Sequence, residues 1–138
     1  MNDANISNDP ALRALIERFP RLFHGAQPAV RSHVPAGWIG ILDALFSGID
    51  ALLDDEQAKS FRAEQIKEKF GTLRLYVSFD RTDTRGVNPN PAALRSLVDA
   101  AVAASEVTCY TCGAPGEMRN LGGWATVRCD AHASRRFE

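Results

Sequence analysis

The run FRAEQIKEKFGTLRLYVSFD, at residues 61–80, contains the clearest strand pattern in this 138-residue chain. Apolar and polar side chains alternate strictly in its second half, which predicts a half-buried β-strand with one apolar face. The apolar positions of this strand are Leu73, Leu75, Val77 and Phe79.

The first half of the same run allows two interpretations. Phe61, Ile66 and Phe70 can face the core from a short helix that ends at Gly71, or from a second strand. We favour a hairpin or an extended lead-in over the helix, because a single strand would leave both of its edges without hydrogen-bond partners.

Basic and aromatic side chains gather around the turn of this predicted hairpin. Arg74 and Tyr76 fall on the polar face of the strand and belong to residue types enriched at protein-interaction hot spots. Lys67 and Lys69 add positive charge, which also suits nucleic acid, although the cluster is thinner than the basic surface of a duplex binder. These four are candidate partner-binding residues, and ordinary solvated side chains are the alternative.

Three amphipathic helices are predicted around this segment. The first begins at Asp9 and Pro10, an N-cap followed by a proline at the first helical position. The second covers about residues 35–54, and the third begins at Pro91 after a turn-rich loop at residues 81–91. The main apolar stripe, in the second helix, consists of Trp38, Ile41, Leu42, Leu45, Ile49, Leu52 and Leu53.

Acidic residues crowd the end of the second predicted helix, at Asp54, Asp55 and Glu56. The helix dipole disfavours negative charge at a C-terminus, so we expect these residues to form a solvated turn outside the helix.

Four residues near the end of the sequence have the spacing of a metal site. They are Cys109, Cys112, Cys129 and His132, in the order Cys-x2-Cys, sixteen residues, Cys-x2-His. Thiolate and imidazole are ligands that zinc prefers, and four protein ligands complete a tetrahedron without leaving a position for an activating water. The pattern therefore predicts a structural zinc ion.

The residues between these ligands are typical of a zinc ribbon. Residues 117–120 and 124–128 can form a small hairpin that returns Cys129 to the first cysteine pair. Gly113 suits the tight turn that follows CYTC.

Two alternatives to this ligand set remain open. Cys109 and Cys112 alone can form a redox pair, with Cys129 as a buried apolar residue, but a thioredoxin-like βαβ context is missing. His24 or His33 can replace His132 as the fourth ligand only if a long loop docks against the site.

The predicted fold class is α+β, with about three helices packed on a small antiparallel sheet and a C-terminal zinc ribbon. Residues 1–107 would form the α+β core and residues 108–138 a zinc-ribbon-like module packed on it, within one structural unit. Trp38 and Trp124 stand at element boundaries, and we expect both in the core because aromatics dominate buried area.

Composition argues against several classes of protein. The net charge of −1 creates no overall attraction for nucleic acid or an anionic membrane. Three cysteines cannot pair completely, which argues against a disulfide framework and favours a reducing compartment. The sequence has neither the apolar run of a membrane-spanning helix nor the basic and apolar start of a secretory signal. We expect a soluble cytoplasmic protein.

The sequence also lacks a recognisable catalytic constellation. It has no His-x-Glu of the kind found in zinc deaminases and no Gly-rich phosphate loop followed by Lys-Ser/Thr. Because the predicted metal site is closed as well, we expect a protein that is not an enzyme.

Several motifs resemble those of a group of small proteins common in bacteriophages and prophages. They are Phe-Pro-x-Leu-Phe at residues 19–23, a Gly-Trp at residues 37–38, Glu-Lys-Phe-Gly-x-Leu-Arg at residues 68–74, and Cys-x2-Cys-Gly at residues 109–113. The match covers most of residues 19–132, with Thr72 and Leu75 where the group is expected to have glycine and phenylalanine. The resemblance implies origin on a mobile element and supplies no activity. Small phage proteins without catalytic apparatus often bind and block host machinery, including CRISPR and other defence complexes.

The leading hypothesis is a zinc-stabilised, non-enzymatic binding protein from a phage or prophage that inhibits or modifies a host protein assembly in the bacterial cytoplasm. The alternative is a nucleic-acid-binding accessory or regulatory zinc-ribbon protein.

Overall fold

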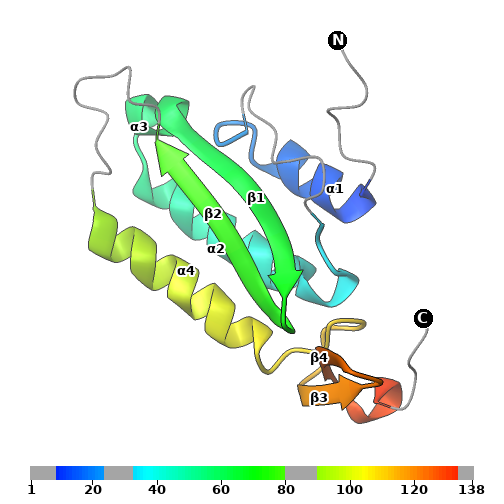
Figure 1. The fold of residues 1–138 in the computed structure, drawn as a ribbon. Coiled ribbons are helices and arrows are strands. Elements are labelled where there is room, and N and C mark those ends of the chain that lie inside the picture. Colours follow the sequence, from blue (N-terminus) through cyan, green and yellow to red (C-terminus); the bar gives the residue numbers. More distant parts are fainter. Residues whose placement is uncertain (1–8, 24–32, 80–89, 134–138) are drawn as a thin grey trace.

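The computed structural model describes residues 9–23, 33–79 and 90–133 (Figure 1). The predicted α+β class is confirmed, with helices and two small antiparallel sheets of two strands each in this part of the chain. The elements in chain order are α1 (Pro10–Arg18), η2 (Ala36–Trp38), α2 (Ile39–Leu52), α3 (Asp55–Ser60), β1 (Phe61–Lys69), β2 (Thr72–Phe79), α4 (Pro91–Ser105), β3 (Glu117–Leu121), β4 (Trp124–Arg128) and η3 (Asp130–His132).

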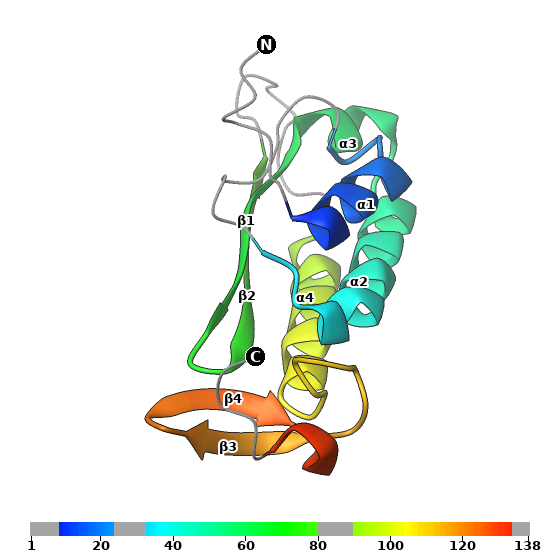
Figure 2. The same cartoon turned by 90° about the vertical axis from the view of Figure 1, so that its right-hand side faces the viewer.

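Helices α1, α2 and α4 form a layer on one face of the β1–β2 hairpin (Figure 2). Helix α4 packs against both α2 and β2, and α1 packs against α2. The β3–β4 hairpin lies at the end of the molecule where β1 turns into β2 (Figures 1 and 2). A Cβ added at Gly71 in that turn would lie 2.7 Å from the sulfur of Met118 in β3, so the two hairpins are in contact.

Strands β1 and β2 form the hairpin that the sequence favoured over a helix. They pair antiparallel from Phe61 opposite Phe79 to Lys69 opposite Thr72, with a shift of register between residues 63 and 65. The apolar positions of both strands face the helix layer, so the alternation in the sequence corresponds to the two faces of the hairpin.

The turn between these strands contains only Phe70 and Gly71. Both have left-handed backbone conformations, with φ of 54° and 89°, as a two-residue type I′ turn requires. This geometry places Phe70 at the tip of the hairpin, where it is 73% exposed, whereas Ile66 is fully buried. The expectation that Phe70 faces the core is therefore wrong, because the turn and not the strand period decides where it points.

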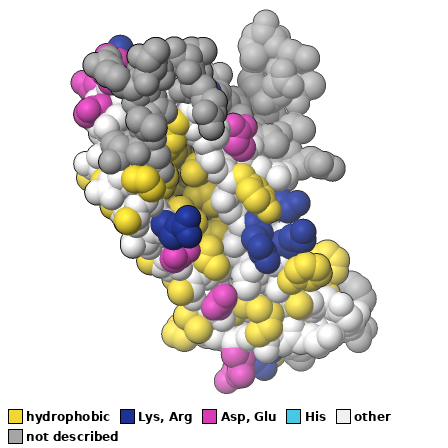
Figure 3. Space-filling model, turned by 60° about the vertical axis from the view of Figure 1, so that its left-hand side comes forward, with side chains coloured by type: hydrophobic (Ala, Val, Ile, Leu, Met, Phe, Trp, Pro, Cys, Tyr) yellow, Lys and Arg dark blue, Asp and Glu magenta, His cyan; other side chains and the backbone are white. Residues whose placement is uncertain are grey.

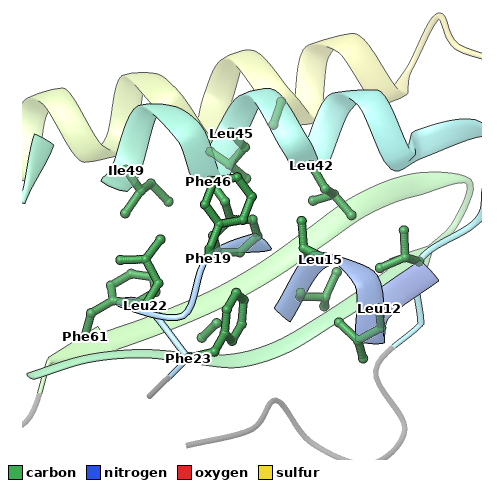
Figure 4. Close-up of a cluster of buried hydrophobic side chains, with 14 of the residues drawn as sticks. Leu12, Leu15, Phe19, Leu22, Phe23, Leu42, Leu45, Phe46, Ile49 and Phe61 are labelled. Atoms are coloured by element: carbon green, nitrogen blue, oxygen red, sulfur yellow. The ribbon is translucent and has the colours of Figure 1, made fainter. Parts of the chain in front are cut away.

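The hydrophobic core lies between the helix layer and the inner face of the hairpin (Figure 4). Trp38 is fully buried, as expected. Phe46, which the predicted stripe omitted, is also fully buried, and its ring centroid lies 6.2 Å from that of Phe19 and 5.3 Å from that of Phe23. Each large apolar side chain buried here contributes about 1.5–3 kcal/mol to folding.

The acidic residues after α2 are exposed to solvent, as expected, but they begin a short helix instead of forming a turn. The side chain of Asp54 accepts a hydrogen bond from the backbone N–H of Gln57, and the side chain of Gln57 accepts one from the backbone N–H of Asp54, both at 2.8 Å. This reciprocal pair is a capping box, and it places Asp55 and Glu56 in the first turn of α3. The prediction of a turn was wrong because the same charges that disfavour the end of one helix favour the start of the next.

Helix α4 begins at Pro91, as predicted, and Asn90 caps it by accepting a hydrogen bond of 3.0 Å from the backbone N–H of Ala93. Most of the predicted loop at residues 81–91 lies outside the described residues, and so does His24.

Asp9 caps α1, as predicted, and also joins α1 to the segment before η2. Its Oδ1 accepts hydrogen bonds from the backbone N–H groups of Ala11 and Leu12. Its Oδ2 accepts one of 2.8 Å from the N–H of Val34 and lies 2.6 Å from Nδ1 of His33. Burial alone would raise the pKa of Asp9, but these hydrogen bonds and His33 lower it below its usual value of 3.8.

Asp9→Ala is expected to cost about 2 kcal/mol of folding free energy at neutral pH, since it removes a helix cap and a link between two segments. A carboxylate with a lowered pKa stabilises the fold above its unfolded pKa and loses this effect as the pH falls through its folded pKa. Urea unfolding at pH 7 and pH 3 should therefore show a difference from wild type that shrinks at the lower pH. Asp99→Ala, at an exposed position of α4, is the control, and a pH-independent difference for Asp9→Ala would contradict the assignment.

Candidate metal centre

The C-terminal segment forms the knuckle and hairpin that the sequence predicted. After α4 the chain passes through the Cys109–Cys112 turn, then β3 and β4, and ends its described part in η3. The two strands pair from Glu117 opposite Arg128 to Leu121 opposite Trp124. This hairpin returns the chain to the first cysteine pair, as the predicted ranges required.

Backbone hydrogen bonds fix the knuckle. The N–H of Cys109 donates to the carbonyl of Ala114 at 2.7 Å, and the N–H of Gly113 donates to the carbonyl of Cys109 at 2.9 Å. The N–H of Tyr110 donates to the carbonyl of Val127 at 2.8 Å and thereby attaches the knuckle to β4. The turn that carries the first two thiols is thus held against the strand that leads to the third.

The structure brings all four predicted ligands together. Their ligand atoms lie within 4.8 Å of one another. The sulfurs of Cys112 and Cys129 are 3.7 Å apart, and Nδ1 of His132 lies 3.7 Å from the sulfur of Cys109 and 3.2 Å from that of Cys129. Two sulfurs on a tetrahedral ion with metal–sulfur bonds of about 2.3 Å lie about 3.8 Å apart. The cluster therefore has the dimensions to hold a tetrahedral metal ion.

The electrostatic surroundings favour ionisation of one thiol. Burial acts to raise the pKa of Cys109, but the backbone N–H groups of Cys129, Cys112 and Thr111 and the side chain of Cys129 lower it from 9.0 to about 6. The pKa of Cys112 is raised: the N–H of Ala114 acts to lower it, but desolvation and the neighbouring thiols outweigh that effect. N–H groups directed at a sulfur stabilise a thiolate, which is the form that binds a metal.

The structure assembles neither a redox pair of two cysteines alone nor a cluster with His33 as the fourth ligand. Cys129 lies with the first two cysteines, and not apart from them as a redox pair of Cys109 and Cys112 alone would predict. His33 instead lies beside Asp9, with its Nδ1 2.6 Å from the carboxylate. His132 is the histidine whose ring nitrogen lies within reach of the thiols.

An ion pair fastens the last ligands to the hairpin. Arg119 in β3 donates from Nε to the carbonyl of Arg128 at 3.0 Å and from Nη2 to the carboxylate of Asp130 at 2.9 Å. Asp130 lies between Cys129 and His132, so these contacts hold η3 in the position that directs both ligands toward the cluster.

The metal-binding segment also contacts the helix layer directly. The N–H of Gly37 donates to the carbonyl of Tyr110 at 2.9 Å, and the indole N–H of Trp38 donates to the carbonyl of Thr108 at 3.3 Å. The rings of Trp38 and Tyr110 meet edge to face with centroids 5.5 Å apart. Gly37 approaches so closely that an added Cβ would lie 1.9 Å from the carbonyl oxygen of Cys109.

The four predicted partner-binding residues share the outer face of the β1–β2 hairpin. Lys67 lies directly opposite Arg74, and Lys69 and Tyr76 belong to the same face by the strand alternation. Figure 3 shows a group of Lys and Arg side chains on this side of the molecule, bordered by hydrophobic ones. Tyr76 is 47% exposed, and the ammonium of Lys69 lies 5.7 Å from the ring centroid of Phe70.

Sequence reasoning missed three residues on the surface or beside a cavity. Phe70 is exposed at the hairpin tip, and Trp124, expected in the core, is 66% exposed. Arg128, which sequence reasoning did not single out, is only 9% exposed. The Phe-Gly pair between two alternating segments was the one available signal, because it is the right length for a two-residue turn.

Within the described residues, no helix combines the length and apolar character needed to cross a bilayer. Comparisons of this chain with protein-family models, with curated proteins and with solved structures found no match.

Proposed function

We propose that this chain is a non-enzymatic, zinc-stabilised binding protein of phage or prophage origin. It contacts a host protein or protein complex in the bacterial cytoplasm and inhibits or modifies it, as an anti-CRISPR or other anti-defence protein would. The proposal is supported by the motif resemblance, by the closed ligand cluster, and by an exposed aromatic residue held at the hairpin tip.

Zinc is the ion that the cluster suits best. Three thiolates and one imidazole in a tetrahedron are a soft, nitrogen- and sulfur-rich set, which selects zinc over magnesium or calcium. With all four positions supplied by protein, the ion has a structural role and offers no site for a reacting water. Elemental analysis of the purified protein tests this identity.

The observation that carries the binding role is the conformation of Phe70. A residue other than glycine in the left-handed region costs about 1–2 kcal/mol, and Phe70 has φ of 54°. Because its ring is 73% exposed, burial within the chain does not offset this cost. Strain retained at an exposed aromatic residue is typical of functional sites, and aromatics are enriched in interface cores.

The charges beside Phe70 favour the same conclusion. Lys67 and Arg74 are directly opposite each other across the hairpin, where like charges destabilise strand pairing. We name Phe70, Lys67, Lys69, Arg74 and Tyr76 the tip surface. An acidic partner with an apolar pocket would neutralise the repulsion and bury the ring, so the tip surface is complementary to such a partner.

Phe70→Asn is expected to stabilise the fold by about 0.5–1 kcal/mol while abolishing partner binding. Asparagine accepts the left-handed conformation, so the substitution relieves strain but removes the aromatic contact. Zinc-loaded wild-type protein used as bait should capture proteins from nuclease-treated bacterial lysate. The Phe70→Asn bait should recover at least about tenfold less of the same proteins, as expected for loss of a hot spot. Val107→Ala, at an exposed position that is not part of the tip surface, should retain them. Identical recoveries on all three baits would contradict the proposal.

The nucleic-acid alternative rests on three cations and one aromatic side chain on a single face. It predicts that a labelled single-stranded oligonucleotide binds with an affinity that falls steeply with salt and weakens when Lys67, Lys69 or Arg74 is replaced. Salt-independent or undetectable oligonucleotide binding would exclude it.

A further inference from the structure

An open hollow of about 710 Å³ lies between the segment that leads into η2 and the β3–β4 hairpin. Its walls include apolar and aromatic side chains together with a few polar groups, a composition typical of sites for small ligands, and its volume falls in the usual range. The residues used below are His33, Tyr110, Leu121, Trp124, Thr126 and Arg128.

The strongest charge among the described residues that line the hollow belongs to Arg128. The residue is 9% exposed, its Nε donates to Oγ1 of Thr126 at 3.1 Å, and its Nη1 is buried without a hydrogen-bond partner. Among the described residues, no carboxylate forms an ion pair with it, and its nearest aromatic contact is Tyr110, at 5.7 Å from guanidinium carbon to ring centroid. A buried cation without a counter-charge is costly, so this arrangement creates a strong local preference for an anion.

The rest of the hollow supplies a flat apolar surface beside that cation. Trp124 is 66% exposed, and Leu121 lies on the same hairpin. Tyr110 contributes an aromatic ring to the same hollow, 5.7 Å from the guanidinium carbon of Arg128. Trp124 and Arg128 both line the hollow, and an indole and a guanidinium in one site can hold a flat group and an anion at the same time.

We propose that this hollow binds a carboxylate that is carried next to an aromatic or apolar group, with the carboxylate on Arg128 and the flat group against Trp124. Such a carboxylate belongs either to a free small molecule or to an aromatic-acidic segment of another polypeptide. The inference does not depend on the tip surface and uses none of its residues.

A carboxylate fits this site better than a phosphate chain. The guanidinium is planar and matches a carboxylate in shape and charge. Among the described residues that line the hollow, Arg128 is the single arginine or lysine, which suits a monoanion better than a dianion. Nucleic acid would add further phosphates, whereas the lining residues that the structure describes include no second lysine or arginine.

The test uses the zinc-loaded full chain and two probes that differ only in charge, N-acetyl-L-phenylalanine and N-acetyl-L-phenylalaninamide. Titration of ¹⁵N-labelled protein should show saturable changes in the NMR chemical shifts of the backbone amides of residues 121–128 and of the Trp124 indole N–H. The acid should bind at least about tenfold more tightly than the amide. Equal binding of the two probes, or binding of neither, would overturn the proposal.

Two variants locate the site. Arg128→Gln should bind the acid no more tightly than the amide. Trp124→Ala should bind the acid at least about tenfold more weakly than wild type does, whereas Val107→Ala should bind it with unchanged affinity. If Arg128→Gln fails to fold or to retain zinc, Trp124→Ala decides, because that side chain is largely exposed and contributes little to the core. If Trp124→Ala binds the acid with unchanged affinity, the acid does not bind in this hollow and the proposal is wrong.

Two further probes distinguish the source of the carboxylate and its class. If a blocked Phe-Asp peptide binds more tightly than N-acetyl-L-phenylalanine, the ligand is a polypeptide segment. If N-acetyl-L-phenylalanine binds more tightly, the ligand is a small molecule. Both results support a site for a carboxylate. Tighter binding of phenyl phosphate or of a thymidine oligonucleotide would overturn it in favour of a phosphate site.

Discussion

Cys112→Ser, or removal of zinc with a chelator, is expected to unfold residues 109–132 while the helix layer and the β1–β2 hairpin stay folded. The segment between the ligands has two short strands and a single fully buried apolar side chain beyond the ligands, Val127. A module with so little core is expected to fold only with the proposed ion bound, so metal binding and folding of the segment would be one process.

The expected size of this effect follows from mass action. When free zinc is present at about 1,000 times its dissociation constant, binding to the folded state alone adds about 4.1 kcal/mol of stability. For a domain of this size, that corresponds to a melting temperature lower by on the order of 10 °C or more without zinc. The loss acts through the metal and not through packing, because the Cys112 side chain is exposed.

Thermal melting with and without chelator gives the global shift, and amide hydrogen exchange gives its location. Exchange should accelerate at residues 109–132 and change much less in β1 and β2, which belong to the main core. Thr111→Ser, one position away and not a ligand, should melt like wild type. Equal melting of wild type with and without chelator would contradict a structural ion.

Much of this architecture could be predicted from local patterns. The alternation that begins at Leu73 identified β2, and Asp9 and Pro91 identified the starts of two helices, because these signals depend only on neighbouring residues. The acidic run at Asp54 was misread, although the capping box is also a local signal: a glutamine stands three residues after the cap.

The ligand cluster was equally predictable, since the spacing of Cys109, Cys112, Cys129 and His132 fixes the chemistry before the fold is known. Trp124 and Arg128 were not predictable in the same way. Their exposure depends on which hairpin faces which, and an arginine in β4 gives no sign in the sequence that Tyr110 and Thr126 will enclose it.

Gly37→Ala is expected to cost about 3 kcal/mol or more, although it adds only one methyl group. An added Cβ would lie 1.9 Å from the carbonyl oxygen of Cys109 and 2.8 Å from the backbone nitrogen of Gly113. Both neighbours are backbone atoms of the knuckle, so no side chain can rotate away to make room. The two segments must separate, and the hydrogen bond from the Gly37 N–H to the carbonyl of Tyr110 is then lost.

Gly40→Ala is the matched control three residues further along the chain. A Cβ added there meets no atom within 4 Å, and the position lies in the first turn of α2. Alanine favours a helix over glycine, so this substitution should be neutral or stabilising by up to about 1 kcal/mol. Urea unfolding of both zinc-loaded variants measures the difference, and similar stabilities would show that η2 and the knuckle are not in the close contact described.

Gly37→Ala should also weaken zinc binding, although it changes no ligand. Gly37 and Trp38 donate hydrogen bonds to the carbonyls of Tyr110 and Thr108, on either side of Cys109, so the helix layer holds the first ligand in place. When that support is lost, the free energy of metal binding must also order the knuckle, and the apparent affinity falls. Competition with a chromophoric chelator should therefore show weaker binding for Gly37→Ala and unchanged binding for Gly40→Ala. Unchanged zinc affinity in a destabilised Gly37→Ala protein would mean that the metal module folds independently of the helix layer.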